Sequence, residues 1–178
     1  MTVLNNFNCG SASAITTVNV YPLPPDPVIT ASGPTTFCQG NSVTLTAPAG
    51  FNYLWSNGAT TQSISVSTSG NHSVTITNAN GCTNTSVITT VTVNPLPPVP
   101  VITPSGPASF CQGGSVTLSI PPYNSYLWSN GATNQNITVG NQGSYSVTVT
   151  SAAGCSSTSA AFPVTVHPLP PVPVITAS

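Results

Sequence analysis

One motif recurs along the chain at a fixed interval, and this interval constrains the fold more than any other feature. Pro-Leu-Pro-Pro stands at 22–25, at 95–98 and at 168–171. Trp55 and Trp128 lie in two copies of Tyr-Leu-Trp-Ser-Asn-Gly-Ala-Thr at the same interval. A constant repeat period of about 73 residues, without insertions, predicts one structural unit that is copied in tandem.

Within each copy, apolar residues alternate with serine and threonine at a period of two. Val43 and Leu45, for example, alternate with Ser42, Thr44 and Thr46. This pattern predicts half-buried antiparallel strands with apolar side chains inward and hydroxyls outward. No segment has the 3.6-residue period of a helix. The expected core comprises Trp55, Trp128, Val43, Leu45, Val116, Leu118, Val74, Ile76, Val147 and Val149.

Roughly six or seven short strands and one buried tryptophan per copy predict an all-β fold of tandem immunoglobulin-like β-sandwich repeats. Asn57-Gly58 and Asn130-Gly131 are hairpin-type turn signals after the Trp strands. Pro163 predicts a sheet edge within the last strand. The Pro-rich joints favour polyproline II, which makes a semi-rigid spacer. The predicted organisation is 1–21 as the last strands of a preceding repeat, 22–27 as a linker, 28–94 as a complete repeat, 95–100 as a linker, 101–167 as a second complete repeat, 168–173 as a linker, and 174–178 as the first strand of a following repeat.

The cysteines follow the same period in two series, one formed by Cys9, Cys82 and Cys155 and the other by Cys38 and Cys111. Fixed cysteines in all-β repeats, without a metal-type C-x-x-C motif, indicate disulfides and an oxidising compartment. We expect pairing within each repeat, Cys38 with Cys82 and Cys111 with Cys155; the alternative is free thiols buried as small hydrophobes. Cys9 is then unpaired, and the chain begins inside a predicted strand, so we expect these residues to be an excerpt from a longer array.

The chain has no Lys or Arg, and Asp26 is its one acidic residue. Neutralisation of nucleic-acid phosphates or attraction to anionic lipids requires basic residues, so neither partner is expected. No apolar run is long enough to cross a membrane, and the N-terminus is not a signal peptide, so export would depend on sequence outside this segment. Acid–base catalysis by paired carboxylates is excluded, and His72 and His167 lie far apart without an acidic partner. We therefore expect no enzyme activity, no cofactor and no metal.

Three motifs together resemble the immunoglobulin-like repeats of very large Bacteroidetes-type surface proteins, including gliding-motility adhesins and type IX-secreted proteins. They are Phe-Cys-Gln-Gly-x-Ser-Val-Thr-Leu at 37–45, Tyr-Leu-Trp-Ser-Asn-Gly-Ala-Thr at 53–60, and Gly81-Cys82. The resemblance covers both complete copies and the partial one before them. It implies a repeat of a cell-surface protein, but such repeats occur in adhesins, in filaments and as spacers beside enzymes. The antibody disulfide geometry is not transferred, because Cys38 precedes its strand and Cys82 follows a turn.

The first hypothesis for function is therefore a non-catalytic rod or shaft of an extracellular cell-surface adhesin or secreted filament. Its partners would be neighbouring repeats and, through uncharged Ser/Thr/Asn faces, other copies of itself. The alternatives are a module that binds glycans or another surface, and a passive spacer attached to a secreted enzyme. In the binding alternative, Tyr53 and Tyr126 are the candidate surface contacts, since Trp55 and Trp128 are assigned to the core.

Overall fold

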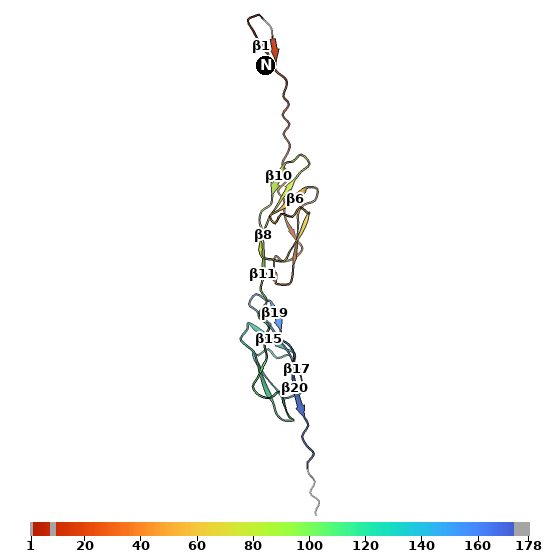
Figure 1. The fold of residues 1–178 in the computed structure, drawn as a ribbon, viewed down its shortest axis with the longest axis vertical. Helices are drawn as coiled ribbons and strands as arrows, with labels where there is room; N and C mark the ends of the chain where they lie inside the picture. The colour runs from red at the N-terminus through yellow and green to blue at the C-terminus, as the bar shows by residue number, and fades with distance from the viewer. Residues whose placement is uncertain (1, 8–9, 173–178) are drawn as a thin grey trace, which may run out of the picture. The chain divides into compact units, whose positions relative to one another are not determined.

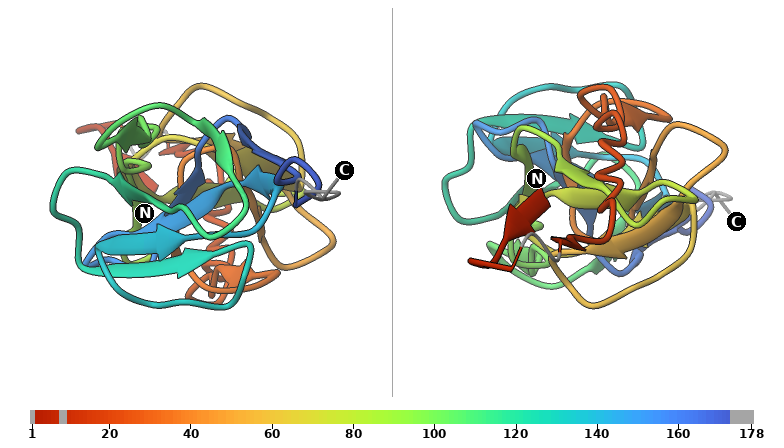
Figure 2. Two further views of the ribbon diagram at one scale, coloured as in Figure 1. Left: turned by 90° about the horizontal axis from the view of Figure 1, so that it is seen from below. Right: turned by 90° about the horizontal axis from the view of Figure 1, so that it is seen from above.

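The computed structural model describes residues 2–7 and 10–172, and within these ranges the fold is all-β, with no helix (Figure 1). The two further views in Figure 2 likewise show strands and loops and no helix among the described residues. The chain begins with an antiparallel hairpin of β1 (Thr2–Leu4) and β2 (Gly10–Ala12). The chain forms two compact units. The first comprises the described parts of Met1–Ser32, Thr44–Ile64 and Asn71–Thr89, and the second Gly33–Val43, Ser65–Gly70 and the described part of Thr90–Ser178.

The second unit contains a complete set of nine strands in three small sheets. Among these nine strands, every pair is antiparallel except the parallel pair of β13 (Ser109–Cys111) and β20 (Phe162–His167). In sheet order, the strands are β12 (Thr103–Pro104), β14 (Val116–Ser119) and β16 (Asn136–Val139); β15 (Ser125–Trp128), β18 (Val147–Thr150) and β19 (Ser156–Thr158); and β13 (Ser109–Cys111), β20 (Phe162–His167) and β17 (Gly143–Tyr145).

Nine earlier strands have the same sheet order, and each begins 73 residues before its counterpart. Their sheets are divided between the two units, so each sheet is described by itself. In sheet order, they are β3 (Thr30–Ala31), β5 (Val43–Thr46) and β7 (Ser63–Val66); β6 (Asn52–Trp55), β9 (Val74–Thr77) and β10 (Thr83–Thr85); and β4 (Thr36–Cys38), β11 (Thr89–Asn94) and β8 (Gly70–His72).

The core of the second unit surrounds Trp128, whose side chain is 1% exposed. Its indole Nε1 donates to the carbonyl of Asn134 at 2.8 Å, so the only polar atom of this buried ring is satisfied. Trp55 is 2% exposed and makes the matching bond to Thr61. The other residues assigned to the core from the sequence are buried as well: Val43, Leu45, Val74, Ile76, Val116, Leu118, Val147 and Val149.

The turn after the Trp strand differs from the hairpin turn that the sequence suggests. Gly131 has a φ of 85°, and the Asn130 side chain accepts the amide N–H of Ala132, so a tight turn does form. The strands on its two sides, β15 and β16, belong to different sheets. The turn therefore redirects the chain from one sheet to another, where a hairpin would have paired the two strands.

Pro163 lies in β20, the middle strand of its sheet, although its missing N–H suits a sheet edge. The register explains how the proline fits. Pro163 lies opposite Ser144 on β17, whereas the pairing with β13 begins only at Thr165. At Pro163, the strand therefore has a neighbour on one side only.

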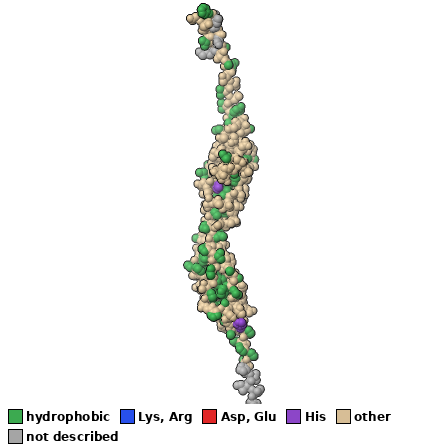
Figure 3. Space-filling view, in the orientation of Figure 1, with side chains coloured by type: hydrophobic (Ala, Val, Ile, Leu, Met, Phe, Trp, Pro, Cys, Tyr) green, Lys and Arg blue, Asp and Glu red, His purple; other side chains and the backbone are tan. Residues whose placement is uncertain are grey.

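The face drawn in Figure 3 consists mostly of uncharged side chains and backbone atoms, with apolar groups that gather over the lower part of the view and no Lys, Arg, Asp or Glu in sight. Hydroxyl pairs across strands replace ion pairs as the polar contacts of this surface. Thr148 and Thr158 hydroxyls lie 2.9 Å apart, and Thr75 and Thr85 repeat this pair at the same distance. Such cross-strand pairs each contribute a few tenths of a kcal/mol up to about 1 kcal/mol.

His72 gives a test of how the copies differ. Both of its ring nitrogens are buried without a hydrogen-bond partner among the described residues, whereas the hydroxyl of its counterpart Tyr145 donates to Asn141. We predict that His72→Tyr raises the free energy of unfolding by about 1–2 kcal/mol, because it removes two unsatisfied polar atoms. Urea denaturation measures the change, with Tyr145→His expected to shift stability in the opposite direction. A loss of stability in His72→Tyr would contradict the prediction.

Candidate functional site

The feature that the sequence did not predict is the connectivity of the cysteines. Cys38 and Cys155 form a disulfide, with an S–S distance of 2.00 Å and a sequence separation of 117 residues. Cys82 and Cys111 are free. The expected pairings within each repeat, Cys38 with Cys82 and Cys111 with Cys155, are therefore wrong. Cys9, expected to be unpaired, lies outside the described residues.

The positions of Cys111 and Cys155 explain why a copy does not pair its own cysteines. Cys111 ends β13 and lies opposite His167, the last residue of β20, so it is at the downstream end of the copy, where the following linker begins. Cys155 precedes β19, and its Sγ lies 3.9 Å from the carbonyl oxygen of Asn94, just before the preceding linker. It is therefore at the upstream end, and the two cysteines of one copy lie at opposite ends.

Asn94 is the point at which the two halves of the observed disulfide meet. Its Cα is the register partner of Cys38 in the parallel pair of β4 and β11. Its carbonyl accepts the amide N–H of Gln39 at 2.8 Å and contacts the Cys155 sulfur. Because a disulfide sulfur carries no proton, this last approach is a contact and not a hydrogen bond. Cys155 is only 1% exposed, so the bond is shielded on that side.

The linker between the two sequence copies is fixed through its carbonyl groups. Ser157 donates its hydroxyl to the carbonyl of Pro97 at 2.7 Å, and Tyr123 donates to Pro98 at 3.1 Å. Proline has no amide donor but keeps its carbonyl acceptor, so side-chain donors can hold a Pro-rich joint through its carbonyl groups. Both donors belong to the copy downstream of the linker.

The preceding linker is held by equivalent means. The amide group of Asn84 donates to the carbonyl of Pro24 at 3.1 Å and to the carboxylate of Asp26 at 2.8 Å. Asn84 and Pro24 stand one repeat period before Ser157 and Pro97. Cys82 lies here with its Sγ 3.9 Å from the carbonyl of Tyr21, the same placement that Cys155 has against Asn94.

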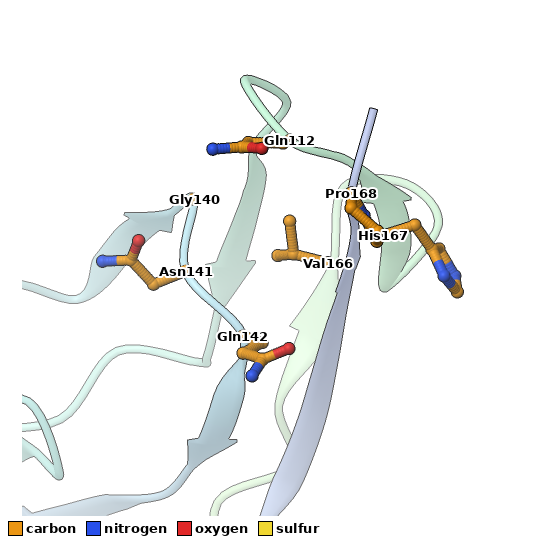
Figure 4. Close-up of a pocket in the computed structure, with 7 residues that line it drawn as sticks. All are labelled: Gln112, Gly140, Asn141, Gln142, Val166, His167 and Pro168. Atoms are coloured by element: carbon orange, nitrogen blue, oxygen red, sulfur yellow. The ribbon is translucent and has the colours of Figure 1, made fainter. Parts of the chain in front are cut away.

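A shallow pocket of about 340 Å³ opens beside the downstream end of the second copy (Figure 4). The Val166 side chain points into it, while the His167 ring points away and bonds Ser109 at 2.8 Å. The lining of the pocket contains no Asp, Glu, Lys or Arg, and its one histidine is His167, whose ring is hydrogen-bonded to Ser109. Its lining residues are Gln112, Gly140, Asn141, Gln142, Val166, His167 and Pro168.

The two candidate surface tyrosines, Tyr53 and Tyr126, are half-buried. The Tyr53 hydroxyl donates to the carbonyl of Pro48, and the Tyr126 hydroxyl accepts the amide N–H of Tyr123. The exposed positions of these strands are instead Leu54 and its counterpart at 127, each 56% exposed. Alternation from the buried tryptophan places these leucines on the outward face of their strands.

Among the residues that the structure describes, no cluster of three or more His, Cys, Asp or Glu side chains could hold a metal ion. The same part of the chain contains no helix that is long and apolar enough to span a membrane.

No protein-family model matches this chain. No curated protein matches it either. Among solved structures, it is similar to the crystal structure of the mouse coronavirus receptor-binding domain complexed with its murine receptor, at 13% sequence identity and a TM-score of 0.40, over 80% of this chain and 100% of that one. Similarity at this level carries no argument about fold or function.

The absence of Lys and Arg allows a direct test of the disulfide connectivity. Val101 is 71% exposed and follows the linker, so Val101→Arg creates a single trypsin site there. After the free thiols are blocked with N-ethylmaleimide, the unfolded but unreduced chain is digested. We predict that fragments 1–101 and 102–178 stay joined on a non-reducing gel, because Cys38 and Cys155 lie on different fragments.

Reduction should then separate the two fragments. Adding Cys82→Ser to this variant should leave them joined, whereas adding Cys38→Ser should separate them without reductant. Separation of the fragments before reduction in the parent Val101→Arg protein would contradict the observed pairing.

Proposed function

We propose that this chain is a segment of a tandem array of immunoglobulin-like β-sandwich repeats, whose period is the interval between successive Pro-Leu-Pro-Pro motifs, and that the array serves as the shaft of an extracellular cell-surface adhesin or filament. The equal offset of nine strands, with matching sheet order, supports the tandem arrangement. The buried tryptophan and the alternating strands support the sandwich.

The observation that carries the proposal is the disulfide between Cys38, in the copy at 28–94, and Cys155, in the copy at 101–167. A domain that acts alone gains more from a bond within itself, because such a bond restrains its own unfolded chain. A bond that spans a linker instead restrains successive copies with respect to each other. This restraint is useful in a shaft, which must transmit position and force along its length.

The contacts of the linkers support the same role. Free Pro-rich spacers are semi-rigid on their own. Here Ser157 and Tyr123 also bind carbonyls of the linker before their copy, and Asn84 does so for the preceding linker. A tether that must leave its neighbouring domains free to move would not need such contacts.

An extracellular location fits both the disulfide and the composition. Disulfides persist in oxidising compartments and are rare where thiols are kept reduced. A surface without Lys or Arg also gives trypsin-like proteases no cleavage site. Because there is almost no like-charge repulsion, the Ser/Thr-rich faces can associate laterally with other copies of the array.

The glycan-binding alternative has weaker support, because the hydroxyls of Tyr53 and Tyr126 are engaged within the chain. An enzymatic role for the segment lacks a pair of carboxylates that could act as acid and base, since Asp26 is its one acidic residue. The spacer of a secreted enzyme differs from a shaft in what lies beyond the segment, so imaging of the whole native protein distinguishes them.

The shaft proposal predicts that native material seen by electron microscopy forms filaments with an axial repeat of about 40–50 Å, the sum of one sandwich and one extended linker. Reductant should broaden the distribution of bend angles between successive beads, because it cleaves the bonds across the linkers. Short globular particles would contradict the proposal, as would filaments whose bending is the same before and after reduction.

A further inference from the structure

We propose that Cys111 is one half of a second disulfide, whose other half is the cysteine that a following copy of this sequence, in the same polypeptide, places where Cys155 lies in its own copy. Cys82 is the complementary half for a preceding copy. This inference rests on the proposed function and deepens it, because it identifies which cysteine of the following copy bonds to Cys111.

Cys111 is held in the same way as the bonded Cys38. Each cysteine ends a three-residue strand and is the parallel register partner of the last residue in the final strand, Asn94 for Cys38 and His167 for Cys111. In both copies, the glutamine after the cysteine donates its amide N–H to that residue's carbonyl at 2.8 Å. The free thiol is therefore placed as the bonded sulfur is, and it is exposed at the end of its copy.

The second cysteine of each copy also has the same surroundings whether it is bonded, as Cys155 is, or free, as Cys82 is. The sulfurs of Cys155 and Cys82 each lie 3.9 Å from the carbonyl of the residue that precedes a linker. The glycine before each cysteine has a positive φ, 79° and 81°, and the side chain four residues earlier accepts the cysteine amide N–H at 3.3 and 3.0 Å. The free cysteines Cys111 and Cys82 therefore have the same local geometry as the bonded Cys38 and Cys155.

The sequence after His167 repeats the sequence that joins and begins the copies before it. Residues 168–173 repeat residues 95–100 without a change, and residues 174–178 repeat residues 28–32. A copy continued from this point brings its second cysteine 117 residues after Cys111, which is the separation of the observed bond. Pairing within the copy is excluded, since Cys155 lies at its other end and is already bonded.

Formation of this bond is an oxidation. The two thiols lose two protons and two electrons as the S–S bond forms, and a small disulfide oxidant such as oxidised glutathione takes up the electrons and is reduced to two thiols. Each complete copy then makes two bonds, a forward one through its first cysteine and a backward one through its second.

The test extends the chain by one copy. Residues 33–94 are added after Ser178, which completes a third copy in the native register, and both chains are folded in a glutathione redox buffer. Free thiols are blocked with N-ethylmaleimide, and bonds are located by peptide mapping without reduction. We expect Cys111 to be bonded to the second cysteine of the added copy, and its labelling to fall at least about tenfold relative to the original chain.

A matched variant changes only the second cysteine of the added copy to serine. Labelling of Cys111 should then return, while the Cys38–Cys155 bond remains. If Cys111 stays labelled in the extended chain while Cys38–Cys155 is present, this inference fails and the proposed function stands. If Cys38–Cys155 is itself missing, the proposed function fails. A bond from Cys111 to Cys82 of another molecule would appear as a ladder on a non-reducing gel. It would contradict the proposal that the partner cysteine belongs to the same polypeptide.

Discussion

The parallel pairing of a three-residue strand with the last strand of each copy determines where everything else at the joint can lie. In the second unit, β13 pairs with the final three residues of β20 and so brings Cys111 beside the residue that precedes the next linker. The same pairing of β4 with β11 brings Cys38 beside Asn94. Without this register, the first cysteine of a copy would have no fixed relation to the linker, and the carbonyl of Asn94 could not contact Gln39 and Cys155 together. The buried tryptophans pack in the cores, whereas these short strands fix the cysteines beside the linkers.

A fold with almost no charge has to satisfy its polar groups in other ways, and hydroxyls do most of this. Ser86 and Ser159, the buried polar residues, accept the amide N–H groups of Val74 and Val147. Surface threonines pair with each other across strands. Serine and asparagine side chains donate hydrogen bonds to carbonyl groups of the Pro-rich linkers. These bonds are little affected by salt, because none of them depends on opposite charges.

Much of this architecture can be predicted from the sequence. Alternation of apolar and hydroxyl residues indicates the strands and the buried face, and the residues assigned to the core from this pattern are buried. The disulfide could not be predicted, for a reason inherent in a repeat: a cysteine that recurs at the same place in every copy offers Cys38 both Cys82 and Cys155 in equivalent sequence contexts. Only the placement of the two cysteine series at opposite ends of a copy distinguishes the pairings, and that placement depends on β13 pairing with β20. The turn at Asn130 was misread for a similar reason, since local turn chemistry does not reveal which sheet receives the next strand.

The interval closed by the Cys38–Cys155 bond affects how the chain can be stretched. A force applied at the two termini passes from one sulfur to the other, so the chain between Cys38 and Cys155, a sequence separation of 117, carries no tension while the bond is intact. A fully extended residue spans roughly 3.3–3.6 Å, and about 400 Å of contour is therefore held in reserve. The final strand of the first copy, the whole linker and most of the core around Trp128 lie within this interval. Reduction of one bond would turn a nearly inextensible segment into an extensible one, which makes the redox state of the surroundings a control on its compliance.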